Sequence, residues 1–266
     1  MDANDAVNRA VLIASIGVAI SSAEQFALLD EFKGGGIFTP VLRSDSKLVI
    51  WAAGRHLLKL FQSVRFLAAV LVLRLILAIL MLPIALASSA RDWTTILWSM
   101  VIASSYIDWR RRVGGDGGEQ MTMLVLIVSA IDFTLAPAES KGRMAAMFIA
   151  AQSCLSYLAA GSAKLVSKVW RSGDALVSLL DTNTYGSARL VKVLRTYPLL
   201  SRTLNWCVIV AEIAFPLALV MPKTVCLLVL AVGLVFHLVN AMVMGLNNFV
   251  WAFAATYPCV YWAAAK

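Results

Sequence analysis

The stretch FLAAVLVLRLILAILMLPIAL, residues 66–86, decides the fold of this chain. Its one charged side chain belongs to Arg74, near the middle of the stretch. The hydrocarbon core of a bilayer is about 30 Å thick, and a helix needs about 20 mostly apolar residues to cross it. A helix also satisfies its own backbone hydrogen bonds, which lipid cannot do. Residues 66–86 therefore predict a membrane-spanning helix.

The composition of the whole chain agrees with this segment. The 266 residues are 61% hydrophobic and 14% charged, whereas a soluble domain is about 45–50% apolar and about 25% charged. A soluble protein of this length cannot cover so much apolar surface, because its exterior needs polar side chains. We therefore expect an all-α, polytopic transmembrane helix bundle that forms one domain over residues 1–266 and lacks a separate soluble domain.

Seven other predominantly apolar segments are also predicted to span the membrane. The eight predicted spans are Val7–Leu29, Phe66–Leu86, Trp93–Tyr106, Met121–Pro137, Met144–Leu165, Leu204–Met221, Thr224–Met244 and Asn248–Ala265. The first is the weakest, because it contains Arg9, Glu24 and Gln25.

A basic linker joins the first predicted span to the bundle core, which we place at residues 66–266. The linker contains three consecutive glycines, Gly34–Gly36, followed by Pro40. Its second half, Leu48–Phe61, combines helically spaced leucines with basic side chains. That pattern predicts a helix lying on the membrane surface.

The basic residues indicate the orientation in the membrane. The formal net charge is +8, and the connections at 30–65, 108–120 and 164–202 hold sixteen of the 23 Lys and Arg residues, against five on the opposite side. Cytoplasmic loops are enriched in Lys and Arg, so we expect both termini outside. The expected location is the cell membrane, as a multi-pass protein of a bacterial inner membrane. Membrane lipids are then its first partners, and nucleic acid is not expected.

The four cysteines predict neither a disulfide framework nor a metal site. Cys154, Cys207, Cys226 and Cys259 lie in or beside apolar segments and form no C-x-x-C pair. We expect them to behave as small hydrophobic side chains. The N-terminus has Asp2 and no basic n-region, so we expect no removable signal peptide.

Polar side chains inside predicted spans require an explanation, since a charge at a helix centre costs about 2.5–3.5 kcal/mol on insertion scales. Arg74 and Glu212 either pair with each other or with backbone groups, or they serve a functional pocket. His237 and Asn240 lie three residues apart on one helix face, as packing residues or as a site. Lys164 ends the fifth predicted span, as a snorkelling anchor or as a functional amine.

A glycine-rich loop, Gly114–Glu119, precedes the fourth predicted span. It lacks the lysine and the spacing of a phosphate-binding loop. We expect a tight turn before a helix, with Asp116 or Glu119 near the positive helix N-terminus.

Two blocks of the sequence resemble a known family. The first block is QSCLSYLAAGSAKL, residues 152–165, followed by WRSGDAL, residues 170–176. The second is VFHLVN, residues 235–240, with Asn248–Phe249 and Tyr257–Pro258 further on. Together they are similar to the HTTM family, the transmembrane domain shared with vitamin K-dependent γ-glutamyl carboxylase. The loop at Asp116 and the stretch 181–186 resemble the smaller bacterial branch of that family, which includes a membrane protein of sporulation-delaying toxin maturation.

The resemblance covers the chain from about residue 60 to the end and implies roles for particular residues. Lys164 occupies the place of the lysine base in the AG-x-x-K-L motif, where the carboxylase has a second lysine at the position of Ala163. The carboxylase epoxidises a reduced quinone, removes a proton from a glutamate γ-carbon and adds CO2 there. The resemblance thus implies a reduced, vitamin K hydroquinone-like cofactor, with His237 and Asn240 orienting its head group or the substrate.

Three functional classes follow from these residues. The leading hypothesis is a membrane enzyme or maturation factor acting on a peptide, with Lys164 as the base, Glu212 and Arg74 supporting the pocket, and Trp170 at its rim. The alternative is a non-catalytic membrane subunit that binds a small partner protein through the basic connection 164–202. A small-solute transporter is disfavoured, since the sequence has no inverted repeat. The carboxylase carries a second domain after its transmembrane part, whereas this sequence ends at Lys266.

Overall fold

A computed structural model describes residues 1–32, 59–87, 93–111, 115–183 and 186–264. In these ranges the secondary structure is entirely helical. The long helices are α1 (Ala3–Ala27), α3 (Val64–Ala87), α4 (Trp93–Arg110), α5 (Gly117–Leu135), α6 (Arg143–Val166), α10 (Pro198–Ala214), α11 (Lys223–Met244) and α12 (Asn247–Ala263). Shorter ones are η1 (Leu29–Phe32), η2 (Ala138–Ser140), α7 (Lys168–Ser172), α8 (Ala175–Leu180), α9 (Ala188–Thr196) and η3 (Phe215–Leu219).

Six of the described helices are long and apolar enough to cross a membrane. They include α1, α3, α5 and α11, together with Ala138–Val166, which contains α6, and Pro198–Leu219, which contains α10. The predicted bundle of long apolar helices is therefore confirmed, with six candidate spans among the described residues. The expected spans at Trp93–Tyr106 and Asn248–Ala265 form α4 and α12, helices of 18 and 17 residues that are not among the six.

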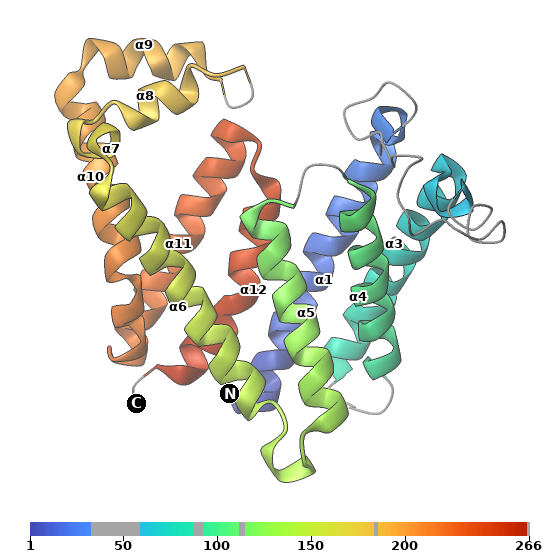
Figure 1. Cartoon of the computed structure of the whole chain (residues 1–266). Helices are drawn as coiled ribbons and strands as arrows, with labels where there is room; N and C mark the ends of the chain where they lie inside the picture. Colours follow the sequence, from blue (N-terminus) through green and yellow to red (C-terminus); the bar gives the residue numbers. More distant parts are fainter. Residues whose placement is uncertain (33–58, 88–92, 112–114, 184–185, 265–266) are drawn as a thin grey trace, which may run out of the picture.

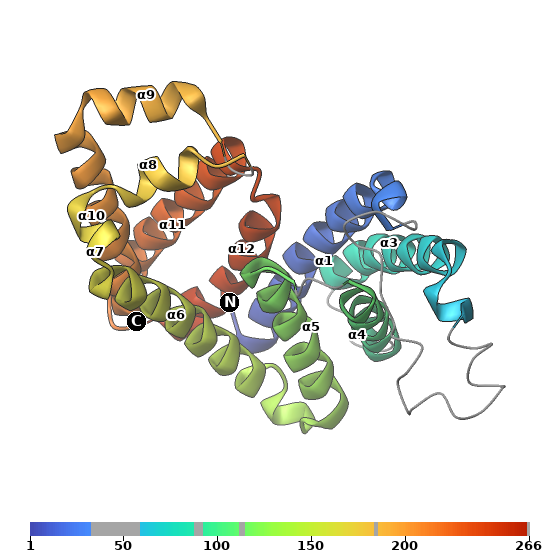
Figure 2. The ribbon, with the colours of Figure 1, turned by 45° about the horizontal axis from the view of Figure 1, so that its top comes forward.

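The long helices run side by side, and the two termini lie at the same end of the bundle (Figure 1). The turn between α5 and α6 lies at that end too, whereas α7, α8 and α9 lie at the other end (Figures 1 and 2). α12 is the central helix, since it packs against α1, α5, α6 and α11.

α1 is among the most buried helices, although its sequence predicted the weakest span. Its inner face, formed by residues such as Val7 and Val11, is fully buried. The polar residues that weakened the prediction each have a partner. Arg9 pairs with Asp5 at the surface, Glu24 accepts a hydrogen bond from Asn247, and Gln25 bonds to Arg74. Pairing removes most of the cost of placing polar groups in an apolar bundle.

The outward faces of the long helices are rich in large exposed apolar side chains. On α3 these include Leu73, Ile76 and Ile79, each about half exposed, and on α11 Leu228 and Val232 are more exposed still. Soluble monomers rarely show contiguous apolar patches of this kind. These faces therefore have the character of surfaces that lipid covers.

The connection after α6 is organised as the three short helices α7, α8 and α9, which lie across one end of the bundle (Figure 2). The apolar face of α9 is buried, with Val191 and Leu194 packed against Leu180 of α8. Arg195 pairs with Asp181 at 2.6 Å. The predicted surface helix Leu48–Phe61 lies almost wholly outside the described residues, and only its end, from residue 59, is seen as helix.

The glycine-rich loop ends in a helix cap, as its sequence predicted. The Asp116 carboxylate accepts a hydrogen bond of 2.7 Å from the backbone N–H of Glu119 and caps α5. A side chain at Gly118 would come within 3.1 Å of the backbone at Asn248 and Phe249, so the start of α5 packs closely on α12.

Candidate functional site

One face of α6 brings the recognised lysine into the bundle. Tyr157, Gly161 and Lys164 are spaced at i, i+4 and i+7, which places them on the same side of the helix. At Gly161 a side-chain Cβ would lie 2.8–2.9 Å from atoms of Glu212 and Ile213 on α10. Only glycine allows the two helices to approach this closely.

Lys164 forms an ion pair with Glu212 across this close contact. The Lys164 ammonium donates hydrogen bonds of 2.9 and 2.7 Å to the two carboxylate oxygens. The lysine side chain is 20% exposed and that of the glutamate 8%. The amine also lies 5.2 Å from the ring centroid of Trp170 on α7, within the range of a cation–π contact. Lys164 therefore points into the bundle, with Trp170 beside it.

A second polar group lies deeper on the same face. The Tyr157 hydroxyl is 2.7 Å from His237 Nε2 on α11 and 2.8 Å from the Tyr257 hydroxyl on α12. Gly233, one turn before His237, makes room for them, because a Cβ there would lie 2.5 Å from the Tyr257 hydroxyl. Three helices thus contribute to one buried hydrogen-bond network.

Aromatic rings enclose this network. Phe215 of η3 stacks on Tyr157 at a centroid distance of 3.8 Å, and Phe253 of α12 stacks on His237 at 4.5 Å. His237 is 3% exposed, and its Nδ1 has no hydrogen-bond partner among the described residues. A buried polar atom without a partner is costly and therefore marks a place where a ligand or water can bind.

The two groups form one structure, which we call the polar seam and define as Lys164, Glu212, Tyr157, His237 and Tyr257. Tyr157 and Lys164 are seven residues apart on α6, a rise of about 10 Å. The two groups are also linked through the other side of the seam, because Glu212 lies three residues before Phe215, whose ring stacks on Tyr157.

The structure does not bring every predicted site residue to the polar seam. Arg74 and Glu212 do not pair with each other, because Arg74 bonds to Ser22 at 2.8 Å and to Gln25 at 3.2 Å, in a separate cluster between α1 and α3. Asn240 lies on α11 one turn beyond His237 and is half-buried. No hydrogen bond joins its side chain to any described residue.

Tyr157 and Tyr257 are the residues of the polar seam that sequence reasoning did not select. Both occur in the blocks that carry the family resemblance. A tyrosine inside an apolar segment gives a weak signal, since its ring packs like phenylalanine and its hydroxyl finds a partner only in the folded bundle.

The polar seam has one free polar atom and several aromatic rings beside it. His237 Nδ1 can bond a carbonyl or hydroxyl oxygen, and the rings beside it are suited to stacking on a flat head group. Neither the cavity at Arg74 nor the open groove along α10 is lined by Lys164 or His237. A ring-sized ligand would therefore reach Nδ1 by moving aromatic side chains aside.

Comparison with models of protein families, with curated proteins and with solved structures gave no match.

Proposed function

We propose that the protein is a membrane enzyme or maturation factor of the HTTM type, which acts on a peptide with a reduced quinone-like cofactor. One observation carries the proposal: the Lys164–Glu212 ion pair and the Tyr157–His237–Tyr257 network occupy one seam between four helices. Ionisable groups inside a membrane bundle are costly and are usually retained for function.

Lys164 acts as the base of this enzyme. In the ion pair it is an ammonium and Glu212 is a carboxylate, separated by 2.7 Å. Transfer of one proton from Lys164 to Glu212 leaves a neutral amine and a neutral acid. The neutral amine then accepts a proton from an acidic substrate group.

The deeper layer orients the head group. His237 presents Nδ1 to an oxygen of the ligand while Nε2 stays bonded to Tyr157. Asn240, one turn away on α11, offers a second hydrogen bond, and Trp170 holds the amine at the other end. A bound quinone supplies the redox chemistry that protein side chains lack. Arg74 has no part in this site, because it lies in a different cluster.

The proposal includes the topology and the location. The six apolar helices are joined by α4 and α12, which gives eight antiparallel passages through a cell membrane, the bacterial inner membrane in our proposal. Both termini then lie outside, and α7–α9 lie on the cytoplasmic side, where their lysines and arginines belong.

The test uses the purified protein in lipid nanodiscs. We expect mass spectrometry of its lipid extract to find a co-purified quinone. We also expect the protein to oxidise added vitamin K hydroquinone in the presence of O2, measured as epoxide formed. Lys164→Met and Lys164→Arg should each reduce the rate by at least about 100-fold, because neither side chain accepts a proton near neutral pH.

Lys168→Met is the matched control, since Lys168 is the next lysine along the chain and is exposed. It should retain the wild-type rate. Full activity of Lys164→Arg would contradict a base at this position, and a protein without quinone or epoxidase activity would contradict the enzyme class.

The alternative, a non-catalytic subunit, is favoured by a different observation. α9 presents Arg189 and Lys192 to the outside while its apolar face is used in packing. In that case the charge reversals Arg189→Glu and Lys192→Glu would abolish function in cells, whereas Lys164→Met would leave it intact at normal protein levels. The enzyme proposal expects the opposite pattern.

A further inference from the structure

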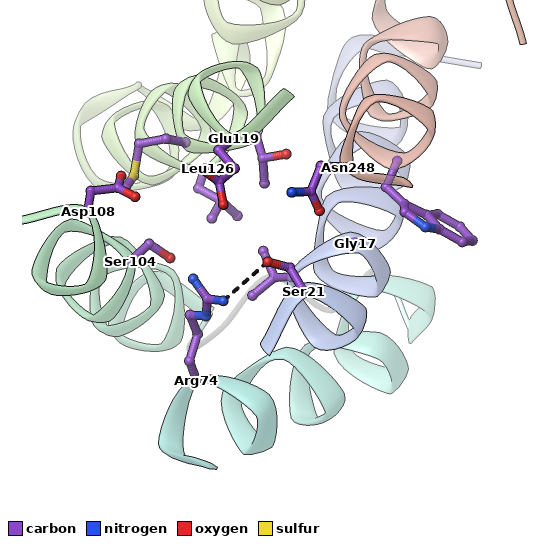
Figure 3. A pocket seen from close by; sticks show the side chains of 12 residues that line it. Gly17, Ser21, Arg74, Ser104, Asp108, Glu119, Leu126 and Asn248 are labelled. Carbon is purple, nitrogen blue, oxygen red and sulfur yellow. Dashed lines mark hydrogen bonds between the residues drawn. The ribbon is translucent and has the colours of Figure 1, made fainter. Parts of the chain in front are cut away.

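A second polar site lies between α1, α3, α4, α5 and α12, away from the polar seam (Figure 3). We call it the Arg74 cavity and define it by the polar residues Ser21, Arg74, Ser104, Asp108, Glu119 and Asn248 that line it. Its volume is about 40 Å³, which is room for roughly three water molecules. The cavity is therefore built from five helices and is small.

Arg74 enters this cavity as a buried cation with neutral partners. It is 5% exposed. Its guanidinium donates hydrogen bonds to the Ser22 hydroxyl at 2.8 Å, the Gln25 side-chain oxygen at 3.2 Å and the Ser21 hydroxyl at 3.5 Å. No carboxylate of the described residues lies within ion-pair distance of it. An arginine buried at this depth normally has a charged partner.

Asp108, which lies beside Ser104 in the cavity lining, is the complementary group. It is half-buried on α4, and in the described part of the chain its carboxylate has neither a hydrogen bond nor an ion pair. Figure 3 shows Asp108 and Ser104 on one side of the cavity, with Arg74 below and Asn248 across from them. One unpaired cation and one unpaired anion thus face a shared space without touching.

Glu119 does not fill the role of partner to Arg74, because Arg111 holds it. The Arg111 guanidinium donates to Glu119 Oε1 at 2.6 Å, and both side chains are largely buried. The lining residues Arg74, Asp108 and Glu119, together with the Arg111 that pairs with Glu119, therefore sum to zero charge. A lone anion or a lone cation would upset this balance in a low-dielectric site.

We propose that the Arg74 cavity binds a small zwitterion of the free amino acid type. Its carboxylate accepts hydrogen bonds from Arg74, and its ammonium group pairs with Asp108. Ser104 and Asn248 complete the polar contacts. The ligand must be small, because the cavity has room for only about three water molecules, and glycine is the smallest amino acid. This site is independent of the function proposed for the polar seam.

The test measures thermal unfolding of the full-length protein in nanodiscs at constant ionic strength. Glycine is the probe, acetate represents its anionic end and methylammonium its cationic end. We expect glycine to raise the unfolding temperature with increasing concentration, since a ligand of the folded state stabilises by mass action. Acetate and methylammonium should leave it unchanged.

Three variants make the result specific. Arg74→Gln and Asp108→Asn should each lose the response to glycine. Because each leaves one charge without compensation, Asp108→Asn should respond to acetate and Arg74→Gln to methylammonium. Arg65→Gln is the matched control, as Arg65 is an exposed arginine on the same helix, and it should behave like the wild type. No response to glycine, or equal responses to glycine and acetate in the wild type, would overturn the proposal.

A second measurement leaves both charged residues in place. Ser104→Cys, in a chain whose exposed Cys207 is replaced by serine, should react with a small methanethiosulfonate reagent. Glycine at ten times its Kd should slow this reaction about tenfold by occupying the site. Cys207 in the wild-type chain, which is exposed and lies outside the cavity, is the control and should be labelled at the same rate with and without glycine. Unprotected labelling at position 104 would reject a ligand there.

Discussion

At the scale of single residues, the polar seam depends on space as much as on polar groups. Gly233 has no side chain, which leaves room for the Tyr257 hydroxyl. A Cβ at position 233 would lie only 2.5 Å from that hydroxyl. The same hydroxyl is bonded to Tyr157, which bonds to His237. A glycine in an apolar helix is otherwise unfavourable by about 1 kcal/mol relative to alanine, so the folded network is what makes it favourable here.

Gly233→Ala should therefore destabilise the protein by about 1–3 kcal/mol, the usual cost of overpacking. Tyr257→Phe removes the atom that the new methyl group would meet. The double variant should then lose less stability than the sum of the two single variants, measured by denaturant unfolding in detergent. Strictly additive losses would show that the Cβ and the hydroxyl do not meet.

At the scale of elements, the turn between α5 and α6 is held by one buried carboxylate. Asp132 is 6% exposed and accepts hydrogen bonds from the backbone N–H of Gly142 at 2.6 Å and of Ala145 at 3.3 Å. It thereby satisfies free donors at the start of α6 from the end of α5. A carboxylate also suits the positive end of the helix.

Asp132→Ala should destabilise the bundle by about 1 kcal/mol or somewhat more, as the loss of a helix cap does. Asp132→Asn keeps one acceptor oxygen and should retain part of the stability. Glu139→Ala, an exposed carboxylate in the same turn, is the control and should have little effect. Thermal unfolding in nanodiscs checks all three, and equal losses for positions 132 and 139 would contradict the capping role.

At the scale of the whole molecule, the arrangement of helices predicts which segments share a side of the membrane. The termini and the α5–α6 turn lie at one end, and α7–α9 lie at the other (Figure 1). Reporter fusions that are active only in the periplasm should therefore be active at residue 1, at residue 140 and at the C-terminus, and inactive between α8 and α9. An active fusion between α8 and α9 would reverse the proposed orientation.

The helices themselves followed largely from the sequence, because an apolar segment of sufficient length forms a helix in lipid whatever its neighbours are. The partner of each buried polar residue did not. Arg74 and Glu212 are the only charged residues of their predicted spans, and the sequence suggested that they pair with each other or with backbone groups. The bundle instead pairs Glu212 with Lys164 and leaves Arg74 with α1.

By itself, the sequence determined that this chain is a set of long apolar helices with a few polar residues inside, and it marked Lys164 and His237 among them. Only the tertiary structure decided which polar residues meet: Tyr157 and Tyr257 join His237, and Arg74 faces Asp108 across a separate cavity. The physical reason is one of range. Helix formation depends on local hydrogen bonds and hydrophobicity, whereas the contacts between polar groups depend on which helices are neighbours and how closely their backbones approach.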